Sequence, residues 1–494
     1  MYINNLSISV LTMAEVKLFQ YLSNFSGEEI KNFLKFINSG LNPTNRIYES
    51  IIKIFIKHKN RFKIMTKSES IDFVSSKSGV KKLSLHNRFS ELSKLCEQFI
   101  SFKQIRGNST ERNLLLLEYY SNTKSYKLFD GLLKITEAEI RNEPYEFRTF
   151  KYLSELYFRA SNRYFFDNKF DKYFIYYKLR VNYSILHFIS ESLKSSFENY
   201  QQGILGVYKG NLLDEVFVKF DIEALLPEIK KTDPKGYNLI MIFFLIHQSV
   251  LDQSKTEYFL KCMELHSMHI GDFTRFENEQ IFMISVTYCI NQTNTGKEEF
   301  YRILFDLINE KIRKGYIDEL KEDNIPVNNF RDYVIIALRL GKLDWIRNFV
   351  DDFSPMLPDR FREDERFIAL GLLKLEEKKY EDAVKLFDKV KKTNYLHYID
   401  SGANKTRAYY NLGYFDEAME EIKKIRSYLS YKEGIPEIHM KKTNLHLKDI
   451  EQLLRYEFDK ISETGLEHYF RRRKPSSIRR WVRIELEKMK IGIS

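Results

Sequence analysis

The 494-residue chain has few of the residues that interrupt regular structure, with only 19 glycines and 9 prolines. A large all-β protein needs many more turn residues, and a collagen-like chain needs glycine at every third position, so both classes are excluded. Cysteine is also scarce. Cys96, Cys262 and Cys289 lie too far apart for a disulfide framework, and we expect a reducing, cytoplasmic location.

Long apolar runs are missing as well. The longest, residues 239–246, has eight residues, whereas a helix that crosses a bilayer needs about 20. Met1 to Val16 contain no basic segment followed by a sustained apolar one, so no secretory signal is expected. We therefore expect no membrane partner.

Sequence signatures of catalysis are absent. Gly296-Lys297 has Asn291 where a phosphate loop needs its first glycine, and there is no G-x-S-x-G, H-E-x-x-H or paired C-x-x-C motif. Cys262, His266 and His269 have a helical spacing that can hold a metal, but no fourth ligand is evident, and we interpret them as a structural helix face. We expect a protein that is not an enzyme and needs no cofactor and no metal.

The net charge of +11 is unevenly distributed. Residues 1–110 contain 17 basic and 8 acidic side chains, residues 111–470 contain 53 and 58, and residues 471–494 contain 9 and 2. Two basic ends therefore flank a slightly acidic middle.

The residues that are abundant predict helices. Hydrophobic residues make up 43% of the chain and aromatic residues 15%, enough to fill a large core. Phe129, Leu132, Leu133 and Ile140 return to one face at helical spacing, and most prolines fall between such stretches. We predict an all-α fold. Aromatic residues such as Tyr173, Tyr176 and Tyr177 are expected to be packing residues.

Two segments repeat a pattern of paired helices. Residues 367–390 place Phe367, Leu370 and Gly371 on a first helix and Tyr380, Ala383 and Phe387 on a second. Residues 408–425 follow with Tyr409, Phe415, Ala418 and Ile422, and the two alanines Ala383 and Ala418 lie 35 positions apart. Small residues at Gly371 and Ala383 let the two helices of a hairpin approach each other.

This pattern resembles the tetratricopeptide repeat, most clearly in residues 330–430. Lys374 stands where the family usually has an aromatic residue, Lys405 and Thr406 replace a Leu-small pair, and the proline that ends each repeat is missing. The resemblance implies stacked antiparallel hairpins and no particular ligand. Similar steps of roughly 35 to 46 residues upstream predict an α-solenoid over residues 111–470.

The two ends are predicted to be separate parts. Residues 1–110 are expected to form a basic helical domain or cap, with a helix start at Ser26-Gly27-Glu28-Glu29 and helices over 47–58 and 85–102. Residues 471–494 are expected to form a basic C-terminal helix.

The C-terminal basic run is the sharpest local feature and has two interpretations. Guanidinium groups bind phosphate and Trp481 can stack on a base, or the same helix caps the solenoid with its apolar side buried. Its candidate contacts for nucleic acid or an acidic partner are Arg471, Arg472, Arg473, Lys474, Arg479, Arg480, Trp481 and Arg483. A second basic stripe contains Lys53, Lys57, Lys59, Arg61, Lys63 and Lys67, and is either a solvated helix face or a path for nucleic acid.

These observations lead to two functional hypotheses. The first is a protein-interaction scaffold or adaptor, because stacked hairpins leave a groove that commonly holds a peptide or protein. Lys374, Lys405 and Tyr409 are its candidate groove residues. The second is a nucleic-acid-binding protein that uses one or both basic ends.

Overall fold

The protein is all-helical in its computed structural model. The model describes residues 17–39, 46–62, 65–204, 209–317, 325–391, 394–473 and 478–491, and in these ranges there are 25 α-helices, two short 3₁₀ helices and no strand. Within the same ranges, none of the helices has the length and apolarity that crossing a bilayer requires.

The chain divides into two compact units, Met1–Ser192 with Ile222–Gly236, and Leu193–Asp221 with Tyr237–Ser494. The helices of the first unit, with α10 running on into the second, are α1 (Lys17–Asn24), α2 (Gly27–Ile37), α3 (Arg46–Lys57), α4 (Lys59–Phe62), α5 (Lys67–Ser78), α6 (Lys82–Gly107), α7 (Ser109–Asn122), α8 (Tyr126–Asn142), α9 (Phe147–Phe166), α10 (Phe170–Ile204) and α12 (Ile222–Thr232).

The second unit contains the remaining helices. These are α11 (Leu212–Lys219), α13 (Pro234–Leu251), α14 (Glu257–His269), η1 (Ile270–Asp272), α15 (Arg275–Asn294), α16 (Glu299–Arg313), α17 (Val327–Arg339), α18 (Leu343–Phe353), η2 (Ser354–Met356), α19 (Asp359–Glu376), α20 (Tyr380–Phe387), α21 (Tyr395–Leu412), α22 (Phe415–Tyr431), α23 (Glu437–Glu457), α24 (Glu463–Arg471) and α25 (Arg480–Lys488).

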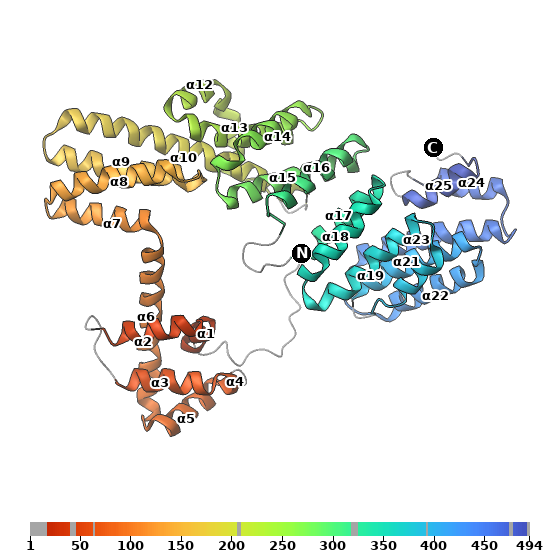
Figure 1. Cartoon of the computed structure of the whole chain (residues 1–494), viewed down its shortest axis with the longest axis horizontal. Helices are drawn as coiled ribbons and strands as arrows, with labels where there is room; N and C mark the ends of the chain where they lie inside the picture. The colour runs from red at the N-terminus through yellow and green to blue at the C-terminus, as the bar shows by residue number, and fades with distance from the viewer. Residues whose placement is uncertain are drawn as a thin grey trace. The chain divides into compact units, whose positions relative to one another are not determined.

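In the first unit, helices α1 to α6 share one aromatic-rich core (Figure 1). The predicted helix start is confirmed: the Ser26 side chain caps the Glu29 amide, and the Glu29 carboxylate accepts a hydrogen bond from the Ser26 amide at 2.7 Å. Phe19 lies against three phenylalanine rings of this core, among them Phe55 at a centroid distance of 5.3 Å. The predicted helices over 47–58 and 85–102 correspond to α3 and α6.

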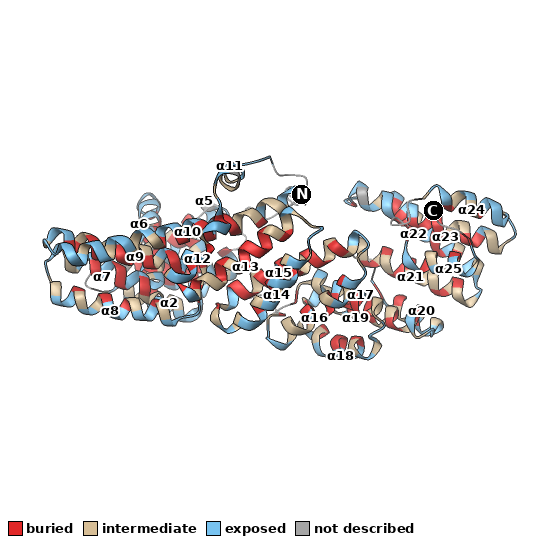
Figure 2. Cartoon of the chain, turned by 90° about the horizontal axis from the view of Figure 1, so that it is seen from above, coloured by how far each residue is buried: buried red, intermediate tan, exposed pale blue. Residues whose placement is uncertain are grey.

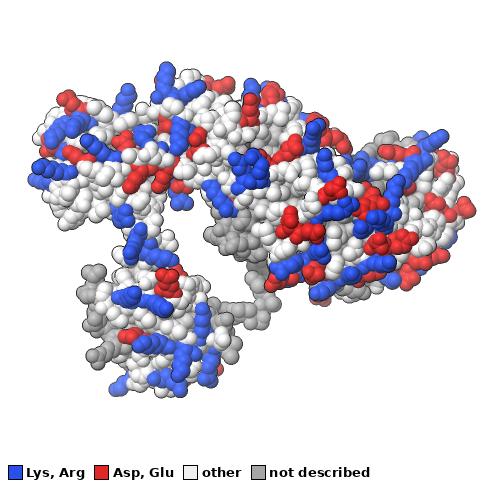
Figure 3. All heavy atoms as spheres, viewed as in Figure 1, with Lys and Arg blue, Asp and Glu red and all other residues white. Residues whose placement is uncertain are grey.

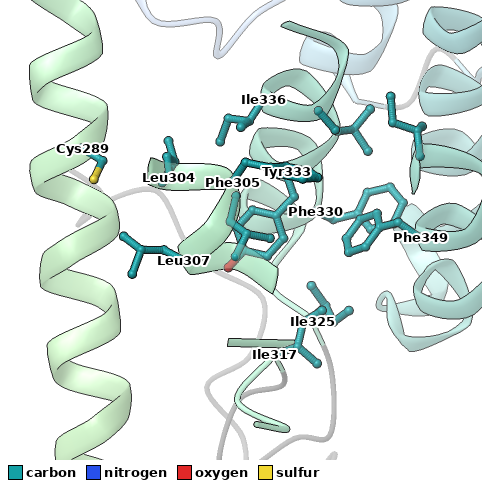
Figure 4. Packing of buried hydrophobic residues seen from close by; sticks show 14 of the residues in the cluster. Cys289, Leu304, Phe305, Leu307, Ile317, Ile325, Phe330, Tyr333, Ile336 and Phe349 are labelled. Atoms are coloured by element: carbon teal, nitrogen blue, oxygen red, sulfur yellow. The ribbon is translucent and has the colours of Figure 1, made fainter. Parts of the chain in front are cut away.

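In the second unit, the buried residues lie on the sides of the helices that meet neighbouring helices (Figure 2). One core runs from α14 to α19. In it Phe330 of α17 packs on Phe349 of α18, with ring centroids 5.2 Å apart, while Leu304, Phe305 and Leu307 reach in from α16 (Figure 4). Consecutive helices are therefore held in pairs by apolar contacts.

The hairpin of α19 and α20 shows why the small residues of the repeat matter. A Cβ atom placed on Gly371 would lie 2.5 Å from the Phe387 ring, which is only 3% exposed. Phe387 also shares a core with Ala383 and with Ala408 of the next helix pair. The close approach predicted at Gly371 is thus filled by one phenylalanine ring.

We predict opposite effects for one substitution at two helical glycines. Gly371→Ala is expected to lower the free energy of unfolding by about 1–2 kcal/mol, because overpacking against Phe387 outweighs the gain in helix propensity. Gly131→Ala in α8, where no atom lies within 4 Å of the added Cβ, is expected to raise it by about 0.5–1 kcal/mol. Urea unfolding followed by circular dichroism measures both. Stabilisation by both substitutions would contradict the packing described here.

Buried histidines make the second unit sensitive to acid. His247 of α13 stacks on Phe217 at 4.2 Å, its Nδ1 lies 2.6 Å from the Ser196 hydroxyl, and burial lowers its pKa from 6.5 to about 4. Burial also lowers the pKa of His266. The unfolded chain therefore binds more protons than the folded chain below pH 6.5. The free energy of unfolding decreases as the pH is lowered from 6.5 toward 4.

We expect His247 alone to account for about 3 kcal/mol of this loss between pH 6.5 and pH 4. The measurement is the free energy of unfolding from pH 7.5 to pH 4 for the wild type and for His247→Gln, which cannot titrate in this range. The wild type should lose more stability than the variant. Parallel pH profiles for the two proteins would rule out the neutral, buried state of His247.

Candidate functional site

A groove lies on the second unit, between the first helices of successive hairpins and the C-terminal helix. It has a volume of about 330 Å³ and is formed by α17, α19, α21 and the start of α25. Its apolar lining is Phe330, Val334, Ile335, Leu338, Ile368, Ala369, Leu372, Trp481 and Ile484. Its polar lining is Arg331, Arg339, Glu365, Glu376, Asp400, Asn404, Arg407, Arg479 and Arg480.

Helical spacing explains why three helices face one groove. On α17, Arg331, Ile335 and Leu338 are separated by four and three positions, so they share one face. Leu372 and Glu376 of α19 are separated by four positions in the same way. Each helix thus turns one stripe toward the core of its hairpin and another toward the groove.

Most cations of the groove are neutralised by neighbouring helices. Arg331 donates to the Glu365 carboxylate at 2.8 Å, and Arg407 donates to Glu376 at 2.9 Å. Arg339 is paired with a carboxylate outside the lining, that of Glu298 at 2.6 Å. The first two pairs join α19 to α17 and to α21.

A buried polar network lies beneath the groove. His397 of α21 places Nε2 2.7 Å from Glu365 and Nδ1 3.4 Å from Asp364, and all three side chains are at most 4% exposed. The backbone amide of Lys391 donates to Asp364 at 3.1 Å. One imidazole thus bridges two adjacent carboxylates of α19, and Glu365 continues the network to Arg331 of α17.

The start of α25 forms one wall of the groove. Trp481 is 9% exposed, with its ring 5.8 Å from Tyr410 and 6.5 Å from His446. Burial, and then the positive charge of Arg479, lower the pKa of His446 well below its usual value. Among the described residues, Arg479 and Arg480 form no ion pair, so they supply the unbalanced positive charge of the groove.

The other described residues of the predicted C-terminal contact set do not belong to the groove lining. Arg473 binds Asp449 through two hydrogen bonds, at 3.1 and 3.0 Å, and Arg471 is paired with Glu467 at 2.6 Å. Burial raises the pKa of Asp449, and the Arg473 and Tyr469 donors oppose that shift. Arg472 is exposed and Arg483 is half-buried, whereas Lys474 lies outside the described residues.

The three predicted groove residues are not in the groove lining. Lys405 lies 2.8 Å from Asp388 and 3.1 Å from Glu421 of α22, and Lys374 lies 3.0 Å from Glu377. Tyr409 is half-buried. The lining residues of α21 are instead Asp400, Asn404 and Arg407. Ile335 of this face is 54% exposed, and that exposure is known only from the fold, so the sequence offered no signal that separates the groove face from the core face.

The cysteine and histidine spacing on α14 does not form a cluster of ligands. His266 lies 2.9 Å from the Asn278 side-chain oxygen, and burial raises the pKa of the Cys262 thiol to about 12. In the described ranges, no group of three or more His, Cys, Asp or Glu side chains is arranged to hold a metal ion.

We expect His397→Ala to destabilise the second unit by about 3 kcal/mol, because two buried carboxylates lose their bridging partner. His439→Ala on α23 is the matched control, since that side chain is exposed, and should change the free energy of unfolding by less than about 0.5 kcal/mol. Chemical denaturation of the two variants and the wild type provides the comparison. An equal effect of both substitutions would show that the bridge does not hold α19 and α21.

Comparison with known proteins does not assign the chain to a family. No family model matches it, and no curated protein matches its sequence.

Proposed function

We propose that the protein is a non-enzymatic scaffold or adaptor that binds a segment of another protein in the groove of α17, α19, α21 and α25. The hairpins of α19/α20 and α21/α22 would be degenerate repeats of the tetratricopeptide type within an α-solenoid. The observation that carries this proposal is the groove itself: a half-open, largely apolar channel whose rim holds Arg479 and Arg480, which form no ion pair with the residues that the structure describes.

The lining indicates the chemistry of the bound segment. Ile335, Leu372 and Ile484 offer a surface for apolar side chains, and Ile335 is 54% exposed. Arg479 and Arg480 favour carboxylates next to them, because the other arginines of the groove are already paired. We therefore expect a segment that combines apolar and acidic residues.

A second surface, on the first unit, also supports binding to proteins. Phe170, Phe174, Tyr177, Val181 and Ile185 recur every three or four positions along α10, and each is at least 37% exposed. A single apolar stripe of this length is unusual on the surface of a monomeric protein. The expectation that Tyr177 is a packing residue does not account for its 44% exposure.

The alternative hypothesis, nucleic-acid binding by the basic ends, has less support at the C-terminal end. Trp481 packs on Tyr410, so its ring is not free to stack on a base, and Arg471 and Arg473 already bind carboxylates. It remains a second candidate function for the N-terminal end, where exposed cations that have no acidic partner in the described part of the chain gather around the end of α3.

Peptides selected from a random library against the full-length protein test the groove. We expect them to pair apolar with acidic residues, and we expect Ile335→Glu to weaken their binding at least about tenfold, because it places a charge in the apolar lining and near acidic ligand groups. Fluorescence anisotropy with labelled peptides measures the affinity.

Leu251→Glu is the matched control. Leu251 belongs to the same unit, is 67% exposed and does not belong to the groove lining. Peptides should bind this variant as they bind the wild type. If selected peptides bind both variants equally, the groove is not the binding site. If the library yields no binder, the scaffold proposal loses its main support.

A further inference from the structure

A hollow in the first unit gathers positive charge that nearby acidic groups do not balance. It has a volume of about 660 Å³ and lies between one face of α3, from Glu49 to Lys57, and the C-terminal end of α5. Lys53, Lys57 and His58 line it from one side and Lys77 from the other. The sequence placed Lys57 and Lys77 20 residues apart, and the fold brings them to one cavity.

Several acidic residues of this part of the chain are paired with cations outside the hollow. Lys82 is paired with Asp72 at 2.7 Å and Arg88 with Glu91 at 2.9 Å, and Lys17 and Lys103 are paired with Glu97 and Glu29. At the hollow, only Lys53 has an acidic partner, Glu49 at 2.6 Å. Among the described residues, no ion pair joins a carboxylate to Lys57, Arg61 or Lys77.

His58 lies among these three cations. Its ring meets the Phe73 ring edge-on at 5.1 Å, and the Arg61 guanidinium lies over the same Phe73 ring, also at 5.1 Å. Partial burial, and then the charges of Lys57, Arg61 and Lys77, lower the pKa of His58. The three cations thus add to the effect of burial on the imidazole.

The arrangement favours an extended polyanion that touches the side-chain tips. Helix C-termini carry partial negative charge, which stabilises Lys57 and Lys77 but opposes an anion deep in the hollow. Lys57, Arg61 and Lys77 are all exposed, so their charged groups are available outside it. Lysine ammonium groups contact phosphates as point charges and do not read bases.

A lipid surface fits this site poorly. Surfaces that bind membranes combine cations with exposed tryptophan, phenylalanine or leucine. The apolar residue in the described lining is Ile54, which is half-buried, and Phe73 is half-buried under Arg61. Across helices α1 to α6, lysine and arginine also outnumber acidic side chains on the face seen in Figure 3. The positive surface is therefore larger than a single phosphate group needs.

We propose that Lys57, Arg61 and Lys77 bind the phosphodiester backbone of a nucleic acid without regard to its sequence. This inference rests on the second candidate function and is independent of the groove. Lys57 and Arg61 belong to the basic stripe identified in the sequence, and the fold adds Lys77 to them. Lys63 of that stripe lies outside the described residues, as does the side chain of Lys67.

The test compares two triple variants of the full-length protein with the same change in net charge. Lys57→Ala/Arg61→Ala/Lys77→Ala removes the proposed contacts, and Lys31→Ala/Lys35→Ala/Lys94→Ala removes three exposed lysines elsewhere on α2 and α6. Fluorescence anisotropy with a labelled 30-base-pair DNA duplex, and with single-stranded RNA of the same length, is measured from 50 to 200 mM salt.

We expect the first variant to bind the duplex at least about tenfold more weakly at 100 mM salt, and its slope of log affinity against log salt to be smaller by about 2 to 3. The control variant should lose much less affinity. Ile335→Glu should bind the duplex like the wild type, so a failure of the groove proposal and a failure of this one give different results. Equal losses in the two triple variants would overturn the site.

Two further measurements distinguish a nucleic acid from free phosphate and from a lipid surface as the ligand. Adding the duplex should raise the pKa of His58 in an NMR titration, because phosphates offset the cations around it. Inorganic phosphate at the same ionic strength, and vesicles that contain phosphatidylserine, should not displace the duplex. A His58 pKa that does not change, or displacement by either competitor, would show that the hollow is not a nucleic-acid site.

Discussion

The groove depends on two adjacent buried carboxylates of α19, Asp364 and Glu365. Burying two negative charges is unfavourable unless partners surround them, and here the partners come from other helices: His397 of α21 and Arg331 of α17. This network fixes the three first helices side by side, with their outer faces turned to the same channel. Apolar packing alone, as at Gly371 and Phe387, is less directional, and it holds the two helices of one hairpin together.

The two candidate sites use positive charge in different ways. In the groove, cross-helix ion pairs neutralise Arg331, Arg339 and Arg407, and the residual charge lies at the rim on Arg479 and Arg480. Around His58, Lys53 is paired with Glu49 of its own helix, whereas Lys57, Arg61 and Lys77 form no ion pair with the described residues. A partly apolar channel with a charged rim suits a peptide, whereas a cluster of exposed cations suits a polyanion.

Much of the local structure could be predicted from the sequence, because it depends on residues close together in the chain. The cap at Ser26, the helices α3 and α6, and the hairpin with Gly371 and Ala383 follow from capping and periodicity. The sequence could not predict which face of α17, α19 or α21 lines the groove. Lys405 is directed toward Asp388 and Glu421, and its neighbours Asn404 and Arg407 line the groove, because the packing of α20 and α22 sets the rotation of α21.

Composition and periodicity are enough to predict from the sequence that the chain is helical, that its helices pair, and that its net positive charge comes from the two ends. Which of the positive charges can still bind a partner depends on the tertiary structure. Trp481, open to two interpretations in the sequence, packs on Tyr410 and becomes a wall of the groove, while Lys77 joins Lys57 and Arg61 through the packing of α3 and α5. A charged side chain can bind a partner only if no neighbouring residue neutralises or buries it, and its neighbours in space come from distant parts of the chain.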